Sequence, residues 1–540
     1  MVTKDFWVLL AMVIYFVAML TIGFIYSKRS NSSTRQYFAG GRGVGPWLTA
    51  LSAEASDMSG WLLMGLPGVA YFTGAADPLW TALGLALGTY LNWKLVARRL
   101  RRYSVVAGDA ITIPDFFSKR FHDKRNIVST IAALIILVFF CVYVGSCFVT
   151  VGKLFSTLFG WDYHLTMVIG AAIVFALIGG YLSVVVTDFI QGLLMFFALA
   201  VVFIGSVASV GGVDNTVAFL KGIPGFLDGT QMATPILNDA GEQIIKAGQA
   251  MFGAPTEYGV ITMISMLAWG LGYFGMPQVL VRFLSIRSSE EIKKSRIIAT
   301  TWCVVSLACG VCIGLVGRAM MPTQFVTQSA AENIFIVVSQ ALLPSFMCGI
   351  VVSGIFAASM SSSSSYLIIG ASAVGENIFR GLLYRKATDR QVMMVARITL
   401  LVMFVFGIVV AFDQNSSIFQ VVSYAWAGLG ASFGPLMLCS LYWRRTNKFG
   451  AIAGMLSGTA TVLIWHNFIK PLGGVFAIYE LLPAFIISLL FIVVVSLLTP
   501  APDAEVLHEF DHYLDDPDDR KVDDDLVAAE IASGEKRAQI

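Results

Sequence analysis

Charged side chains are scarce in this 540-residue chain, and their scarcity excludes most soluble architectures. Asp, Glu, Lys and Arg together make up 13% of the residues, whereas a soluble domain has about 25%. Hydrophobic residues reach 57%, and apolar windows of about 20 residues, the length that crosses a bilayer, recur along the chain. We therefore predict an all-α, multi-pass protein of the plasma membrane.

The sequence also lacks the patterns of several other protein classes. Its seven cysteines are odd in number and fall inside apolar segments, which argues against a disulfide framework. The glycine-rich segment 40–45 lacks the Lys-Ser/Thr ending of a phosphate-binding loop, and basic residues do not cluster with aromatics as at a nucleic-acid site. We expect no organic cofactor, no nucleic-acid partner and no enzymatic activity; the oligomeric state is unknown.

Thirteen apolar segments are long enough to be membrane-spanning helices. They cover residues 6–26, 46–71, 79–97, 127–157, 164–184, 187–210, 258–284, 297–320, 336–372, 396–412, 418–443, 450–469 and 477–498. Lys and Arg gather in every second loop, and positively charged loops remain on the cytoplasmic side. This alternation predicts an N-terminus outside the cell and a C-terminus inside.

The end of the chain differs in charge from the rest. Residues 501–540 hold 13 acidic and 4 basic residues, so the net charge of +2 hides a basic membrane domain, residues 1–500, and an acidic cytoplasmic tail. A basic cytoplasmic face favours the anionic headgroups of the lipid bilayer. We expect the tail to be a solvated or partly helical appendage rather than a functional module.

One carboxylate, Asp57, stands in the middle of the second apolar segment. A charge near the membrane centre costs at least ~2.5 kcal/mol on insertion scales and is usually kept because it binds or moves an ion or a substrate. Gly60, Gly65 and Pro67 in the same segment favour a broken helix whose free carbonyl groups can bind a cation. The alternative is a buried Asp that caps a kinked helix and serves structure only.

The seventh apolar segment repeats these features. Residues 269–277 place three glycines and a proline inside one helix, which favours a break. Because the two broken helices are five segments apart, they should cross the membrane in opposite directions, as in an inverted repeat. Repeats over about residues 46–210 and 258–443 would hold a ligand between the breaks. Glycine and proline scattered as in ordinary membrane helices are the alternative.

The ninth apolar segment supplies hydroxyl groups. Five serines, residues 361–365, follow Ala358, and helical spacing puts Ala358 about one turn before Ser361 and Ser362. Oxygen ligands without a cage of carboxylates suit a monovalent cation better than Ca²⁺ or Zn²⁺. Close packing of small side chains explains the serines alone equally well, but Asp57 on the second segment favours a cation site.

Four stretches of the chain resemble the sodium/solute symporter family: residues 40–42, 48–68, 269–277 and 421–428. The similarity covers about residues 5–500. It implies a leucine-transporter-like fold of about 13 helices with two inverted repeats of five, sodium as the coupling ion, and uptake of a small solute. Members that carry L-proline are the most similar. Other functions to weigh are symport of another small solute, a cation channel and a transporter-derived sensor.

The resemblance also implies roles for individual residues. For sodium they are the carbonyl groups of Ala55, Met58 and Ala358 and the hydroxyl groups of Ser361 and Ser362. Asp57 would supply charge nearby. Asp188 would lie on the sodium exit path, or else be an ordinary acid at a helix start. For the substrate they are Ser59, Gly60, Trp61, Gly65, Tyr143, Trp269, Tyr273 and Pro277.

Proline suits this substrate set chemically. A pyrrolidine ring packs on aromatic faces, its ammonium is attracted to them, and its carboxylate can bind amides exposed at a helix break. Two positions depart from the family pattern: Ser362 stands where close members often have Thr, and Glu54 adds a second acid near Asp57. Whether Glu54 points into the vestibule or changes the charge of the site is open.

Overall fold

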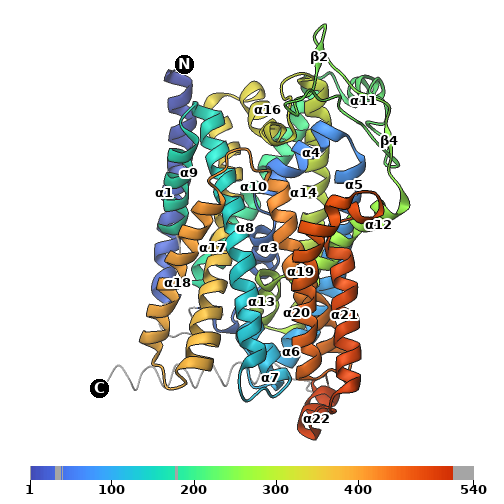
Figure 1. The fold of residues 1–540 in the computed structure, drawn as a ribbon. Coiled ribbons are helices and arrows are strands. Elements are labelled where there is room, and N and C mark those ends of the chain that lie inside the picture. The colour runs from blue at the N-terminus through green and yellow to red at the C-terminus, as the bar shows by residue number, and fades with distance from the viewer. Residues whose placement is uncertain (1, 31–37, 39, 177–179, 515–540) are drawn as a thin grey trace.

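Helices packed side by side along one direction make up nearly all of the structure (Figure 1). The computed structural model describes residues 2–30, 38, 40–176 and 180–514. Nine helices in these ranges are long and apolar enough to cross a membrane, and a bent pair, Val260–Gly275 and Pro277–Ser285 at 43°, makes a tenth candidate. The predicted all-α membrane class is confirmed.

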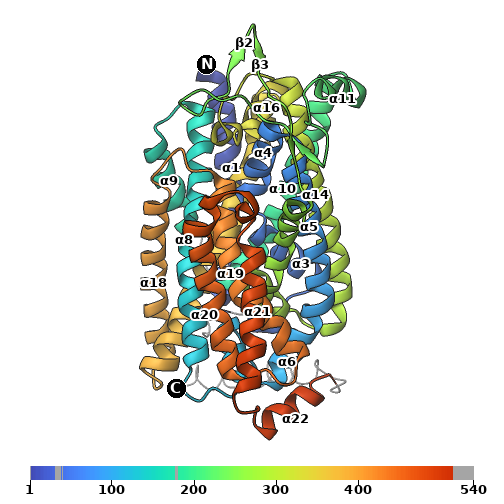
Figure 2. The same ribbon diagram turned by 45° about the vertical axis from the view of Figure 1, so that its right-hand side comes forward.

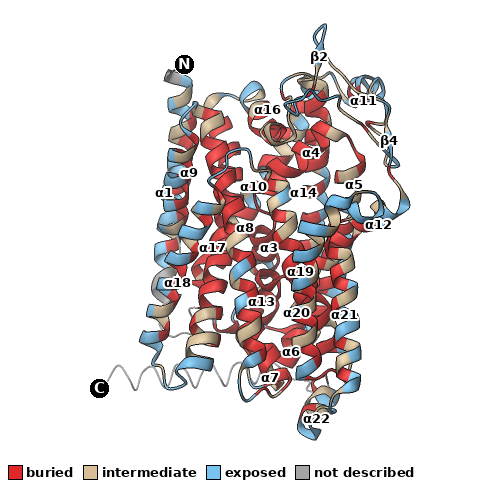
Figure 3. Ribbon diagram, in the orientation of Figure 1, coloured by how far each residue is buried: buried red, intermediate tan, exposed pale blue. Residues whose placement is uncertain are grey.

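The long helices form the body of the bundle. They are α1 (Val2–Ser30), α8 (Ile127–Phe159), α10 (Tyr181–Ser209), α14 (Ile292–Met320), α17 (Ser345–Ser372), α18 (Asp389–Val410), α19 (Ile418–Tyr442), α20 (Lys448–Ile464) and α21 (Leu481–Leu498). Buried residues dominate the inner helices α17 and α19, whereas α1, α18 and α21 expose much of their length (Figure 3). The exposed side chains on these outer helices are largely apolar, as a lipid environment requires.

Two helices inside the bundle are interrupted. The first consists of α3 (Pro46–Asp57), η2 (Trp61–Gly65) and α4 (Leu66–Thr73), and the second of α12 (Val260–Leu267), η4 (Ala268–Gly275) and α13 (Pro277–Ser285). The backbone leaves the helical region at Met58 (ψ 76°) and Met276 (ψ 106°). The two interrupted helices run in opposite directions, since α4 lies above α3 whereas α13 lies below α12 (Figure 1). The prediction of two helix breaks is confirmed.

Shorter elements connect the long helices. They are η1 (Gly40–Arg42), α5 (Ala76–Leu91), η3 (Asn92–Ala97), α6 (Arg98–Val106), α7 (Ile113–Arg120), α9 (Tyr163–Ala176), η5 (Ser289–Glu291), α15 (Gln328–Ala331), α16 (Ile334–Leu342), η6 (Ala373–Leu383), η7 (Trp465–Ile469), η8 (Lys470–Leu472) and η9 (Gly474–Ala477). The predicted boundary between segments 164–184 and 187–210 is wrong, because α10 already begins at Tyr181. Gly180 before it has a φ of 99°, which glycine adopts far more readily than other residues.

The two ends of the bundle carry different structures (Figure 2). One end has α11 (Val213–Lys221) and two small antiparallel sheets, in which β1 (Gln231–Met232) pairs with β4 (Thr256–Glu257) and β2 (Ile245–Lys246) with β3 (Gln249–Ala250). The other end has α6, α7 and α22 (Ala504–His512), as Figure 1 shows. The ring of Tyr513 stacks on Tyr103 at 4.4 Å, so the start of the predicted tail is helical and packed; residues 515–540 lie outside the described residues.

A buried ion pair ties three helical elements together near the end that carries the small sheets. Lys153 Nζ on α8 lies 2.7 Å from Glu332 Oε2. Glu332 also accepts hydrogen bonds from the backbone N–H groups of Ile418 and Phe419 at the start of α19. The carboxylate therefore joins α8 to the exposed N–H groups of a helix N-terminus, where negative charge is favourable.

Candidate functional site

The two helix breaks lie next to each other inside the bundle. Trp61 follows the first break and Trp269 precedes the second, and their ring centroids are 6.2 Å apart. Between the same two interrupted helices, Gln278 Nε2 donates a hydrogen bond to Asp57 Oδ1 at 3.1 Å. All four side chains are buried. The tertiary structure thus unites two segments that the sequence singled out separately.

Aromatic rings surround Trp269. Its centroid lies 5.0 Å from Tyr479 in a stacked pair, 5.3 Å from Phe419 and 6.2 Å from Trp426. Tyr273 meets Trp426 edge-on at 5.1 Å, and the indole N–H of Trp426 donates to the Trp269 carbonyl at 2.9 Å. Such offset and edge-on pairs are favourable contacts between rings. They give the breaks an apolar wall with one polar edge.

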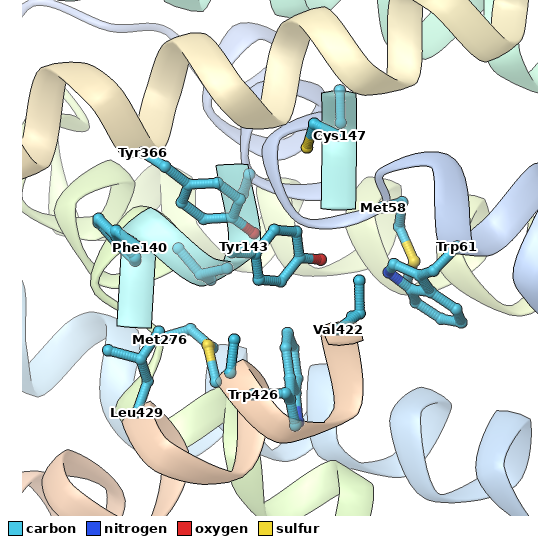
Figure 4. Close-up of a cluster of buried hydrophobic side chains, with 14 of the residues drawn as sticks. Met58, Trp61, Phe140, Tyr143, Cys147, Met276, Tyr366, Val422, Trp426 and Leu429 are labelled. Carbon is cyan, nitrogen blue, oxygen red and sulfur yellow. The ribbon is translucent and has the colours of Figure 1, made fainter. Parts of the chain in front are cut away.

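Tyr143 on α8 faces the first break from the other side (Figure 4). Its hydroxyl donates to the Asp57 carbonyl at 3.1 Å and lies 3.3 Å from the Ser59 hydroxyl. A Cβ atom at Gly60 would collide with the side chain of Thr150, also on α8. The Tyr143 hydroxyl therefore adds a hydrogen bond to a carbonyl that also accepts from the Ser59 N–H and the Trp61 indole N–H, and glycine allows α8 to approach this closely.

The remaining predicted substrate residues, Gly65 and Pro277, belong to the two interrupted helices. Gly65 lies against the start of α19, where a Cβ atom would come within 3.3 Å of Phe419. Pro277 is the first residue of α13, and its missing N–H group costs nothing at a helix start. The rings of Tyr143 and Trp61, with Trp426 opposite them, point toward a common space between the helices in Figure 4.

The serines of α17 meet the end of α3. Ser361 Oγ donates to the carbonyl groups of Ala55 at 2.6 Å and Ala358 at 3.1 Å. Ser362 Oγ is buried and makes no hydrogen bond within the described residues. Three predicted sodium ligands, Ser361, Ala55 and Ala358, are thus in direct contact through uncharged oxygens. The unsatisfied hydroxyl of Ser362, the residue next to Ser361, fits a small cation with oxygen ligands.

Asp57 adjoins these oxygens without a hydrogen bond to them. Its Oδ1 atom accepts from Gln278, while Oδ2 has no hydrogen-bond partner among the described residues. Met58 follows directly, and its N–H donates to the Glu54 carbonyl as the last bond of α3. The Asp57 side chain faces α13, whereas the carbonyl of Ala55, two residues earlier, faces α17.

Asp188 occupies the middle of a buried polar network. Its Oδ2 lies 2.9 Å from Arg282 Nη2 and accepts from Ser52 Oγ at 2.8 Å. Arg282 also donates to Ser365 Oγ at 2.6 Å. The explanation of Asp188 as a helix-starting acid is wrong, because α10 begins seven residues earlier at Tyr181. Its charge is balanced by Arg282 rather than by a helix N-terminus.

Comparisons with known proteins identify the family of the chain. The model of the sodium:solute symporter family matches residues 37–458. The osmoregulated proline transporter OpuE of Bacillus subtilis (strain 168) is 42% identical over 498 residues, covering 92% of this chain and 95% of the relative. A sodium/proline symporter of Staphylococcus aureus (strain JH9) is 40% identical over 501 residues, covering 91% and 93%.

The chain belongs to the sodium:solute symporter family. This symporter is therefore a multi-pass membrane transporter rather than an enzyme, and sodium coupling is the property that defines its family. A solved Na⁺-coupled sialic acid symporter, bound to its substrate in an outward-open state, superposes with a TM-score of 0.71 at 20% identity, covering 92% of this chain and 99% of that one. This likeness establishes the fold of the symporter.

Several residues at the site of the symporter were not predicted. Gln278, Tyr366 and Trp426 contact Asp57, Tyr143 and Trp269 respectively. Trp426 lies within the stretch 421–428 that carried the resemblance, and Gln278 follows the helix-breaking Pro277, so both had a signal in the sequence. Tyr366 had none, because one tyrosine on an apolar helix is more often packing. Arg282, which is also buried, was not predicted to belong to the site.

Proposed function

We propose that this symporter takes up L-proline together with sodium by alternating access. The observation that carries the proposal is the meeting of an aromatic wall, Trp61, Trp269 and Trp426, with unsatisfied oxygen atoms at two adjacent helix breaks. Two relatives at 40% identity or more are named as proline transporters. Proline has an apolar ring and two charged groups, which matches a wall of rings beside free backbone groups.

Sodium would bind where α17 meets α3. The ligands would be the carbonyl oxygens of Ala55, Met58 and Ala358 and the hydroxyl oxygens of Ser361 and Ser362. Support comes from the 2.6 Å approach of Ser361 to Ala55 and from the unsatisfied hydroxyl of Ser362. Asp57 would offset the cost of removing water from the ion. Asp188 would lie on the sodium exit path. Because it forms an ion pair with Arg282, its carboxylate could contact sodium only after that ion pair opens.

Proline would bind between the breaks. The implied contacts are the rings of Trp61, Tyr143, Trp269 and Tyr273 and the polar groups near Ser59, Gly60, Gly65 and Pro277. A hexose presents several hydroxyl groups, and each one buried without a partner costs ~1–3 kcal/mol. The aromatic wall contains few side chains that could pair with them. The same reasoning leaves another compact amino acid as the second candidate substrate.

The finer topology is part of the same proposal. We infer thirteen membrane crossings, including the short apolar helices Trp61–Thr73 and Tyr163–Ala176, and inverted repeats over about residues 46–210 and 258–443. The opposite directions of the two broken helices support the repeats. From the basic loops we infer that α6 and α7 lie in the cytoplasm, with the N-terminus and the Lys153–Glu332 pair on the outer side and the acidic tail inside.

Coupling follows from linkage between the two ligands. If sodium favours the outward-open state and orders the substrate site, each ligand raises the affinity for the other. One positive charge crossing ~100 mV releases about 2.3 kcal/mol, and a tenfold sodium gradient adds about 1.4 kcal/mol. Together they support roughly a few-hundred-fold accumulation of proline.

Competition for labelled proline uptake tests the substrate. In vesicles that contain the purified protein, unlabelled proline and its ring analogues should compete far better than glucose or sialic acid, and only when sodium is present. Trp269→Phe should raise the proline concentration for half-maximal uptake, whereas Trp161→Phe, at a half-exposed position away from the breaks, should not. Inhibition by another solute without inhibition by proline would refute the substrate assignment, and non-saturating flux would indicate a channel.

A further inference from the structure

A side chain from outside the two inferred repeats reaches the aromatic wall. Helices α20 and α21 follow the repeats in the chain and lie beside α19 (Figure 2), and α21 also packs against η4, which carries Trp269. Tyr479, two residues before α21 begins, stacks its ring on Trp269 at 5.0 Å with 21° between the ring planes. The segment before α21 therefore covers a ring that is predicted to contact the substrate.

Hydrogen bonds from the backbone and from the side chain fix the position of Tyr479, which is 2% exposed. Its backbone N–H donates to Ser265 Oγ on α12 at 2.6 Å, and Ser265 precedes Trp269 by about one helical turn. Its hydroxyl donates to the Ser423 carbonyl on α19 at 2.7 Å. The indole of Trp426, three residues after Ser423, donates to the Trp269 carbonyl. Tyr479 is thus bonded to both helices that support the Trp269 ring.

The next residue, Glu480, anchors this segment to the loop between α20 and α21. Its buried carboxylate lies 2.9 Å from His466 Nδ1 and 2.8 Å from Lys470 Nζ. Burial alone would raise the pKa of Glu480, but the hydrogen bond with His466 and the charge of Lys470 lower it, so the carboxylate is ionised at neutral pH. The His466 ring also lies 4.6 Å from the ring of Tyr424 on α19. The loop therefore holds Tyr479 against α19.

An ordered Trp269 ring favours binding of a solute. A side chain that a ligand must immobilise loses rotational freedom, and this loss weakens binding. Stacking on a fixed ring orders Trp269 before the solute binds. An aliphatic side chain could fill the space of Tyr479, but it could neither stack on the indole nor donate to the Ser423 carbonyl. The chemistry of Tyr479 thus suits orientation of Trp269 better than simple packing.

We infer that Tyr479 is a positioning residue for the solute: it holds the Trp269 ring in its binding orientation, and Glu480 holds Tyr479 in place. Tyr479 acts through Trp269 rather than by its own contact with the solute. The inference deepens the proposed function and rests on it, because it takes Trp269 as part of the substrate site. It gives α21 and the preceding loop a part in solute affinity, although both lie outside the inferred repeats.

Binding of labelled proline to the purified protein at saturating sodium tests this role. Tyr479→Leu removes the ring and should weaken proline binding roughly two- to tenfold, whereas Tyr479→Phe keeps the ring and should bind nearly as the unmodified protein does. Sodium binding without solute and the maximal uptake rate should change little, because the proposed sodium ligands lie on α3 and α17. Phe468→Leu, at a 72% exposed position in the same loop, is the control and should bind proline normally.

A double variant tests whether Tyr479 acts through Trp269. Trp269→Leu removes the ring that Tyr479 orders, so the double variant Trp269→Leu/Tyr479→Leu should bind proline as Trp269→Leu does. Independent contacts would instead give effects that multiply. Glu480→Gln should weaken proline binding in the unmodified background and add nothing to Tyr479→Leu, because its effect also passes through the same ring.

Two results would overturn the inference. One is multiplied effects in the double variant with Trp269. The other is unchanged proline affinity in Tyr479→Leu, and a loss of sodium binding and maximal uptake rate alongside it would show that Tyr479 serves structure only. Failure of the proposed substrate gives a different result: the unmodified protein then binds another solute and not proline, and the same variants measured with that solute still decide the role of Tyr479.

Discussion

Replacement of Ser362 by Ala is predicted to weaken sodium binding without lowering the thermal stability of the sodium-free protein. The Ser362 hydroxyl is buried and has no hydrogen-bond partner among the described residues. Such a group destabilises the protein by ~1–3 kcal/mol, so its removal should leave the sodium-free melting temperature unchanged or raised. As a ligand to a cation the same hydroxyl contributes ~1.5–3 kcal/mol, and its loss should raise the sodium concentration for half-maximal proline uptake roughly ten- to hundredfold.

Neighbouring serines give matched comparisons for this prediction. Ser361 bonds the Ala55 carbonyl across the helix interface, so Ser361→Ala should weaken sodium binding and also lower the sodium-free melting temperature. Ser359 donates only within its own helix, to Ile355, and Ser359→Ala should change neither quantity greatly. Melting temperatures with and without sodium, together with sodium-dependent uptake, distinguish the three. A lower sodium-free melting temperature for Ser362→Ala, with unchanged sodium dependence, would show that Ser362 only packs.

Two further predictions concern buried charges. Asp57→Asn should abolish sodium-stimulated uptake while the protein still reaches the membrane, because the amide can keep the contact with Gln278 but loses the charge; normal sodium activation in uptake assays would refute the assignment. Lys153→Met should lower stability by ~3–5 kcal/mol, since it leaves the Glu332 carboxylate buried and unpaired. The double variant Lys153→Met/Glu332→Gln should lose less than the sum of the single variants in thermal unfolding, and full additivity would contradict the coupling.

The local sequence was sufficient to predict the features that depend on residues close together in the chain. Helix breaks at Met58 and Met276 follow from nearby glycine and proline, which act on the backbone within one turn. The membrane class follows from apolar length alone. The adjacency of the two breaks was also expected, because the similar features of the two segments suggested an inverted repeat with a ligand between the breaks. The boundary at Gly180 was missed although the sequence carries a signal for it, since the pair Gly179-Gly180 interrupts the apolar run and such a pair marks turns.

Only the tertiary structure shows which side chains contact one another across the helix bundle. Asp188 and Arg282 are 94 positions apart in the chain, and nothing near Asp188 distinguishes an acid at a helix start from one in a buried ion pair. The five serines look alike in sequence, yet Ser361 meets Ala55, Ser365 meets Arg282 and Ser362 meets no partner in the described chain. The rotation of α17 about its axis separates their roles, and that rotation is set by the packing of its neighbours, since all sides of this buried helix are similarly apolar.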